Sequence, residues 1–114
     1  MSLAQTVYET PPPAFLSVLD ETIIRLVGLH NGVKDVFLTV AVLAQISSHD
    51  EIQSDDPYYG AWVVSKAIHR LIHAGRIVAI DCETPSGSFT YILPAGSRPV
   101  IAMPVYIVDN RTRH

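Results

Sequence analysis

The stretch that decides the fold of this chain spans residues 63–96 and reads VVSKAIHRLIHAGRIVAIDCETPSGSFTYILPAG. Its first part carries apolar residues at helical spacing, and Gly75 can adopt the left-handed conformation that ends a helix. Two runs of strand-like composition follow, residues 77–81 and 88–93, with a proline and a glycine in the turn between them. The stretch therefore predicts a helix over 61–74 that leads directly into a two-stranded hairpin.

The predicted helix has an apolar and a polar face, each covering about half of its circumference. The apolar face holds Val64, Ala67, Ile68, Leu71, Ile72 and Ala74. The polar face holds Ser65, Lys66, His69, Arg70 and His73. Trp62 falls in the middle of the polar face, and Tyr58 and Tyr59 project there too if the helix begins early. These aromatic residues are expected either to be covered by another part of the chain or to form a binding surface.

The residues upstream of this helix predict two further helices. An extended segment, residues 1–13, ends in three prolines, and the last of them can serve as the first residue of a helix that Asn31 or Gly32 ends. Asp35 is expected to cap a second helix that continues to about Ser47. Because this second segment is apolar almost all round, we expect it to be the central, buried helix. The helix over 61–74 is expected to pack Ile68, Leu71 and Ile72 into the core beside Phe37 or Leu38. Its β-branched residues leave a strand as the alternative.

Two less regular segments complete the chain. Residues 47–56 are polar and predict a loop that holds at most a short helical turn or strand, and Asp56-Pro57 is a helix start signal. Gly60 weakens the following turn, so the regular helix is expected to begin at Ala61. Beyond the hairpin, the apolar run Val100–Val108 contains Pro104, which confines it to an edge strand or an extended arm. The apolar side chains of this run are expected to be shielded from water, by packing either across the core of the same chain or against a second subunit.

Composition limits the kinds of protein this can be. The chain has 114 residues, 48% of them hydrophobic and 17% charged, which is typical of one globular domain. A single cysteine, Cys82, excludes an internal disulfide framework and any cysteine-based zinc site. The N-terminus lacks the pattern of a secretory signal, and the most apolar segment, residues 36–46, is too short to cross a bilayer. We therefore expect a soluble, cytoplasmic protein.

The charge distribution separates one segment from the rest of the chain. The net charge is −3, which counts against general nucleic-acid binding. Residues 57–80, however, contain no Asp or Glu and carry Lys66, Arg70 and Arg76, whereas residues 50–56 form an acidic loop. This contrast predicts one polar working face on an acidic body. The solvated side of a surface helix would account for the same run of charges.

The quoted stretch resembles the recognition helix and wing of bacterial and archaeal winged helix-turn-helix proteins, over about residues 60–95. The resemblance implies an α+β winged helix, with a helical core and a C-terminal β-hairpin wing, over residues 14–95, followed by an arm over 96–114. The sequence departs from the superfamily where a short helix and tight turn normally precede the recognition helix, since an acidic stretch stands there. Either the helix that begins near Val36 is the first of the motif and the second is abbreviated within 49–59, or the two upstream helices are the first two.

The resemblance implies a small DNA-binding protein, a transcriptional regulator or a plasmid or phage accessory factor, that acts as a homodimer on double-stranded DNA. The helix would enter the major groove and the wing would approach the neighbouring backbone. Lys66 and Arg70, one helical turn apart, can meet one stretch of phosphates, or Arg70 can reach a guanine. Because such domains commonly pair to read two half-sites, we expect the arm to lie against a second subunit. The expected nucleic-acid-binding residues are Ser65, Lys66, His69, Arg70, His73, Arg76, Thr84 and Ser86.

A second function fits the same fold. The wing tip carries no Lys or Arg, and Asp81 and Glu83 flank it, whereas a wing that grips phosphate is usually basic. The alternative is a winged-helix protein–protein interaction module that does not bind DNA. Its partner-binding residues would be the aromatic patch formed by Tyr58, Tyr59 and Trp62.

The sequence gives no support for catalysis or for a cofactor. His69 and His73 have the spacing that places two imidazoles on one metal, but the glutamate of the HExxH motif is absent and Arg70 would repel a cation. Cys82, at the end of a predicted strand, is expected to be a packed residue and not a nucleophile. No carboxylate pair, glycine-rich phosphate loop or Ser/His/Asp arrangement has supporting context. We expect no enzyme activity, no metal and no membrane partner.

Overall fold

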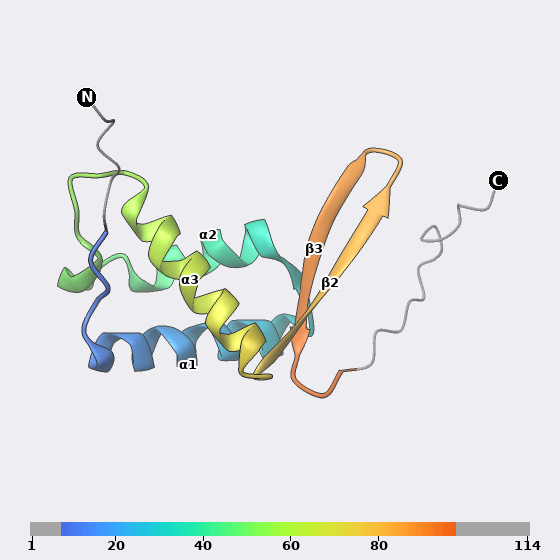
Figure 1. Cartoon of the computed structure of the whole chain (residues 1–114), viewed down its shortest axis with the longest axis horizontal. Coiled ribbons are helices and arrows are strands. Elements are labelled where there is room, and N and C mark those ends of the chain that lie inside the picture. The colour runs from blue at the N-terminus through green and yellow to red at the C-terminus, as the bar shows by residue number, and fades with distance from the viewer. Residues whose placement is uncertain (1–7, 98–114) are drawn as a thin grey trace, which may run out of the picture.

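A computed structural model describes residues 8–97 of the chain (Figure 1). This part contains three α-helices and a three-stranded antiparallel sheet, so the predicted α+β class is confirmed. The predictions for the first seven residues and for the apolar run Val100–Val108 lie outside the described residues. None of the helices in the described part has the length and apolar character needed to cross a membrane. In chain order the elements are α1 (Pro13–His30), β1 (Val33–Lys34), α2 (Asp35–Ile46), a 3-10 turn η1 (Asp50–Ile52), α3 (Tyr59–His73), β2 (Ile77–Thr84) and β3 (Gly87–Pro94).

Helix α1 begins and ends where the sequence predicts. Pro13 is its first residue, where a missing N–H costs nothing because the first turn has no internal acceptor for it. Asn31 (φ 54°) and Gly32 (φ 111°) both adopt positive φ angles and end the helix. Gly32 is also required by space, since a Cβ there would lie 2.7 Å from Leu93 Cδ2 and 2.9 Å from Tyr91 Cε2. The chain can therefore pass directly from α1 into β1 against the sheet.

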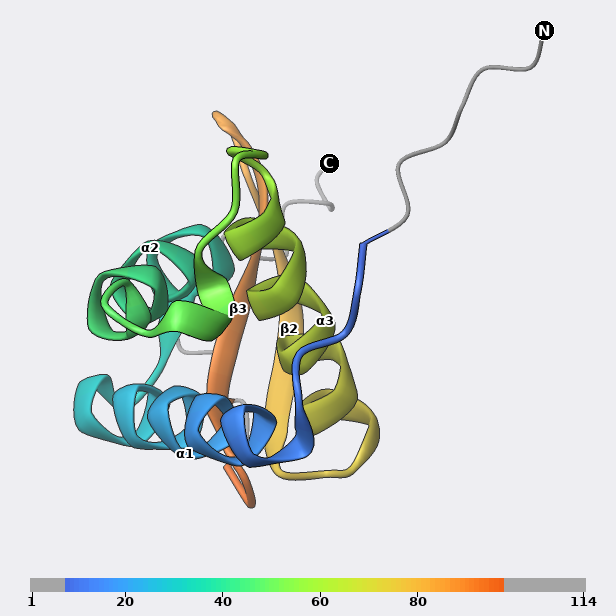
Figure 2. The ribbon, with the colours of Figure 1, turned by 90° about the vertical axis from the view of Figure 1, so that its left-hand side faces the viewer.

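The three helices lie on one side of the sheet and enclose the core between them (Figures 1 and 2). Ile68 and Leu71 of α3 are buried in one core cluster with Leu38 of α2, as the sequence predicts. Two strand residues close the core from the sheet side, Ile77 and Ile92, which are 2% and 1% exposed. The remaining buried apolar residues are Phe15, Leu19, Ile23, Leu26, Val27, Val42, Ile46, Ile52, Val63, Val64 and Ala67.

The buried face of α3 is rotated slightly from the prediction. Val63 is buried, whereas Ile72 is half-buried and Ala74 is exposed beyond the end of the helix. The regular helix also begins at Tyr59 and not at Ala61. Gly60 is used here for close packing, because a Cβ at this position would lie 2.9 Å from Leu43 Cδ2 of α2. The buried stripe of α3 therefore starts at its first turn, where it meets α2.

Helix α2 corrects a second prediction, that it would be central and buried. Only Leu38, Val42 and Ile46 are buried, and they form one stripe that faces α1 and α3. Val36, Phe37 and Val40 are 63%, 60% and 61% exposed. The reason is geometric, since a helix at the edge of a three-helix layer buries one stripe whatever the polarity of its remaining surface. Of the two α2 residues predicted as alternatives beside α3, Leu38 is therefore buried and Phe37 is exposed.

The start signals of α2 and α3 also differ from the prediction. Asp35 is the first residue of α2 and does not cap it, because the preceding residues, Val33 and Lys34, form β1. Asp56 Oδ1 accepts a hydrogen bond of 2.8 Å from the backbone N of Tyr58, so it caps the turn that precedes α3. The loop before α3 holds the short helical turn η1, as the sequence predicts. Two helices of ordinary length, α1 and α2, thus precede α3 in the chain.

The sheet has the strand order β1-β3-β2. Strands β2 and β3 form the predicted hairpin, with Ile77 opposite Pro94 and Thr84 opposite Gly87, and both strands are longer than predicted. Gly87 (φ 137°) lies where the tight turn requires a positive φ. Strand β1 was not predicted, because two residues are too few to show an alternating pattern, and it pairs Val33 with Ile92. The tip of the hairpin extends beyond the helical layer (Figure 1).

Candidate nucleic-acid interface on helix α3

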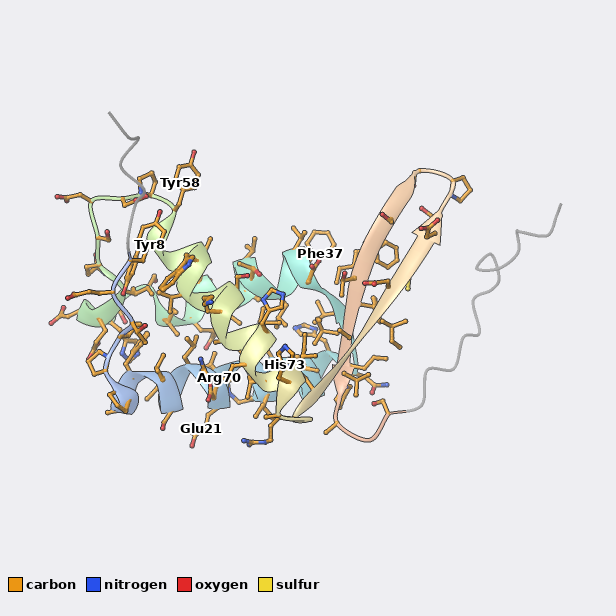
Figure 3. The ribbon with its side chains drawn as sticks, in the orientation of Figure 1. Tyr8, Glu21, Phe37, Tyr58, Arg70 and His73 are labelled. Atoms are coloured by element: carbon orange, nitrogen blue, oxygen red, sulfur yellow. The ribbon has the colours of Figure 1, made fainter. Side chains whose placement is uncertain are left out.

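The polar face of α3 is open to solvent over most of its length. Lys66, His69, Arg70 and His73 are all exposed, and Ser65 beside them is half-buried. Their helical spacing puts them on the side opposite the buried residues of α3, and Figure 3 labels two of them, Arg70 and His73. The structure therefore brings five of the predicted nucleic-acid-binding residues onto one helix face.

A groove of about 410 Å³ runs beside this face. The cationic and imidazole side chains of α3 form one wall, and the N-terminal segment and α1 form the other. The lining residues are Thr10, Pro11, Leu16, Trp62, Val63, Lys66, His69, Arg70 and His73. The groove is thus lined both by apolar residues and by the basic residues of α3.

Arg70 is engaged by α1. Its guanidinium donates to the Asp20 carboxylate and forms the only ion pair among the described residues. The two side chains are 42% and 26% exposed, so solvent screens their attraction, and such a pair contributes about 0–1 kcal/mol. A phosphate group could therefore replace Asp20 as the partner of Arg70 at a small cost in free energy.

Two other polar side chains of this face, those of His69 and Lys66, contact residues of α3 itself. His69 Nδ1 lies 2.9 Å from the carbonyl oxygen of Ser65, which can only accept, so Nδ1 carries the hydrogen and Nε2 is the nitrogen left for another partner. Lys66 Nζ lies 6.0 Å from the centroid of the Trp62 ring. At that distance the cation–π attraction is at its outer limit, and the ammonium group stays available to an anion.

The aromatic residues on this face are covered by another part of the chain, one of the two alternatives that the sequence leaves open. The N-terminal segment before α1 runs beside α3 (Figure 2). The Tyr8 ring lies 5.0 Å from the Trp62 ring and 5.6 Å from the Tyr59 ring, centroid to centroid. Trp62 and Tyr59 are half-buried as a result, and only Tyr58, at 72% exposure, projects freely.

Two hydrogen bonds attach the N-terminal segment at the start of α3. Tyr8 OH donates to Asp56 Oδ2 (2.9 Å), and Tyr59 OH donates to the carbonyl oxygen of Glu9 (2.6 Å). The hydrogen bond to Asp56 raises the pKa of Tyr8 above its ordinary value, because it favours the protonated phenol. Burial, and next the charge of Glu9, raise the pKa of Tyr59. Both phenols therefore remain protonated donors at neutral pH.

The three remaining predicted residues lie apart from the polar face. Arg76 is exposed in the turn after α3, where its backbone N donates to the carbonyl oxygen of Leu71 (2.9 Å). At the tip of the hairpin, Thr84 Oγ1 donates to the carbonyl oxygen of Gly87 (2.8 Å) and lies 3.1 Å from Ser86 Oγ. The tip lies away from α3 (Figure 1). The predicted residues thus form one group on α3 and one at the hairpin tip, with Arg76 in the turn between α3 and β2.

Sequence reasoning missed Asp20 and Tyr8. Asp20 is 50 positions from Arg70, and no local pattern links a carboxylate on one helix to a guanidinium on another. The sequence did indicate that another part of the chain could cover Trp62, because this residue lies on a polar helix face. It did not identify Tyr8 as the covering residue. Both residues change which side chains of α3 are open to a ligand, because Asp20 pairs with Arg70 and Tyr8 covers Trp62.

No group of three or more metal-ligating side chains gathers within residues 8–97. Comparisons of the chain with protein-family models, with curated proteins and with solved structures found no match.

Proposed function

We propose that this chain is a small winged-helix DNA-binding protein, a transcriptional regulator or a plasmid or phage accessory factor, and that α3 is its recognition helix. The observation that carries the proposal is the exposed polar face of α3, which has Lys66, His69, Arg70 and His73 in one stripe and no carboxylate on the helix itself. Basic and hydrogen-bonding side chains on one exposed helix face are what phosphate and base contacts need.

The arrangement of the elements supports the same proposal. The order α1-β1-α2-α3-β2-β3 and the sheet order β1-β3-β2 are compatible with a winged helix, in which the helix before the hairpin enters the major groove. In this proposal Lys66 contacts phosphate, and Arg70 contacts phosphate or the edge of a guanine. Arg76, Thr84 and Ser86 would meet the backbone on either side of the groove.

The test is a fluorescence-anisotropy titration of labelled duplex DNA at low salt. Lys66→Gln should weaken binding to every duplex alike, because a phosphate contact carries no sequence information. The matched control is Arg25→Gln, which removes one positive charge from α1, where Arg25 Nη2 donates to Gln45 Oε1 (3.3 Å) on α2. If the two variants lose affinity equally, the effect comes from net charge and α3 is not the contact surface.

The proposal includes a homodimer, because two copies would present two recognition helices to two half-sites. In the described part of the chain, α2 leaves Val36, Phe37 and Val40 exposed, and apolar side chains exposed together on one helix are a candidate interface between two copies. Sedimentation at tens of micromolar should give the mass of two chains. A monomer that keeps full DNA affinity would remove the dimer from the proposal and leave DNA binding in place.

The competing function, docking of a protein on Tyr58, Tyr59 and Trp62, has one specific observation in its favour. Tyr58 is 72% exposed beside an acidic loop, and large exposed aromatics are common anchors of protein interfaces. Against it, the face of Trp62 is already occupied by Tyr8. Tyr58→Ala should leave DNA affinity unchanged, and a large loss of DNA affinity in this variant would mean that the aromatic patch belongs to the DNA interface.

A further inference from the structure

The side of the hairpin that faces away from the helices is apolar. Because successive side chains of a strand point to opposite faces, burial of Ile77 and Ile92 in the core sends their neighbours to the other side. Three cross-strand pairs lie there, and we call them the outer sheet face: Val78 with Leu93, Ile80 with Tyr91, and Cys82 with Phe89. All six side chains are half-buried in the described structure.

A wing that stands free in solvent should carry polar residues on the side that faces away from the helices. In this hairpin the polar residues near the tip lie on the opposite side. Toward the tip, the side that faces the helices carries Asp81, Glu83, Ser88 and Thr90, with Thr90 Oγ1 donating to Asp81 Oδ1 (2.9 Å). The side away from the helices carries Cys82 and Phe89 at the same level. The segment at β1 shields the edge of this face beside β3, because Lys34 Nζ lies 4.3 Å from the Phe89 ring centroid and the backbone at Gly32 lies close to the Leu93 and Tyr91 side chains. An apolar face turned away from the helical layer indicates a cover that residues 8–97 do not supply.

The chain reverses its direction at the end of β3. Ser97 N donates to the carbonyl oxygen of Pro94 (3.1 Å), and Gly96 has φ 80°, which is a type II turn with glycine at its required third position. Such a turn reverses the chain within four residues. The next residues along the sequence, after Arg98 and Pro99, are the uncharged apolar run Val100–Val108.

We propose that the run Val100–Val108 folds back over the outer sheet face of its own chain and covers it. The run is long enough, because nine extended residues span about 30 Å and the eight-residue β3 spans about 26 Å. Pro104 excludes it from a central strand but not from packing across a face or at an edge. This interaction does not depend on the proposed DNA binding.

The outer sheet face could be covered by the run Val100–Val108 of the same chain or by that of a second copy, and the short linker within the chain favours the first. A segment joined by a short linker has an effective concentration in the millimolar range. A second copy at micromolar concentration is about a thousandfold more dilute than this effective concentration. Binding of the chain's own run to the outer sheet face is therefore favoured. The sequence had suggested that the arm lies against a second subunit, and the turn at Pro94–Ser97 is the observation that favours its own sheet.

The only cysteine of the chain lies on the outer sheet face and makes a direct test available. Counted back from the turn, Ala102 reaches the level of Phe89, whose cross-strand partner is Cys82. Full-length Ala102→Cys and Met103→Cys variants place a second thiol on each side of the returning run. Under mild oxidation, one of them should form an intramolecular disulfide, detected as a monomer on a non-reducing gel and by peptide mass spectrometry.

The matched control moves the native thiol to the opposite side of the same strand, in a Cys82→Ser, Glu83→Cys background. Cross-linking should fall at least tenfold there, and equal cross-linking would show random collision and overturn the proposal. A disulfide-linked dimer as the main product would show that a second copy supplies the cover. Hydrogen exchange on the wild-type chain gives an independent readout, because peptides from Val100–Val108 should exchange at least tenfold more slowly than an unstructured segment. Exchange at the unstructured rate would also overturn the proposal.

Discussion

If α3 binds DNA as proposed, the ion pair between Arg70 and Asp20 should make DNA affinity sensitive to Asp20, a residue that need not touch DNA. In the free protein Asp20 holds the guanidinium, so a phosphate must compete for it. With the Arg70 and Asp20 side chains 42% and 26% exposed, the pair contributes at most about 1 kcal/mol. Because a factor of ten in affinity corresponds to about 1.4 kcal/mol, Asp20→Asn should tighten DNA binding by up to about fivefold per copy.

The control for this variant lies next to it on α1. Glu21→Gln removes the same charge from an exposed residue that makes no ion pair in the described structure (Figure 3). Anisotropy titrations of both variants on one duplex, at one salt concentration, separate loss of the pair from loss of a negative charge. Asp20→Asn should bind more tightly than Glu21→Gln. Equal affinities, or an Arg70→Gln variant that binds as well as the wild type, would refute the reasoning.

Three further predictions concern stability, each measured by urea unfolding. Leu71→Ala should lower the free energy of unfolding by about 2–5 kcal/mol, because the side chain is 2% exposed, and a near-neutral result would mean that α3 packs with another face. Gly28→Ala on α1, where a methyl group meets nothing within 4 Å, should raise it by about 0.5–1 kcal/mol, whereas Gly60→Ala should give no such gain because the methyl group would meet Leu43 at 2.9 Å. A gain as large at Gly60 as at Gly28 would contradict the close packing of α3 on α2. Since the folded state raises the pKa of Tyr8 above its ordinary value of 10.0, the stability that this phenol contributes is complete below pH 10 and is lost as the pH rises through the raised pKa. Tyr8→Phe should be less sensitive to alkali than the wild type, and an identical pH profile would contradict the hydrogen bond to the Asp56 carboxylate.

The elements that the sequence predicted well are those with local signals. The start of α1 at Pro13, the end of α3 at Gly75 and the β2–β3 hairpin each follow from a residue whose backbone preference is strong, and none depends on distant partners. The hairpin also shows the alternation that one buried face imposes. Such features are readable because the physical cause lies within a few residues of its effect.

The features that the sequence did not predict depend on contacts between distant segments. The exposure of Phe37 follows from the position of α2 at the edge of the layer, which its uniformly apolar sequence does not encode. The pairing of β1 with β3 needs only two residues. On the candidate site, the polar residues of α3 could be listed from their helical spacing. Their partners, Asp20 and Tyr8, could not, because the three-dimensional arrangement alone brings them there.

The central claim, that the polar face of α3 binds DNA, is tested most directly by the salt dependence of wild-type binding. Each phosphate contact releases condensed counterions, so the logarithm of the association constant should fall by about 0.9 per contact for each unit of log salt concentration. Lys66, Arg70 and Arg76 on two copies would make about six contacts, and the expected slope is therefore about −5. A linear plot with a slope near that value would support the account. No binding to any duplex at low salt, or a slope near zero, would contradict it.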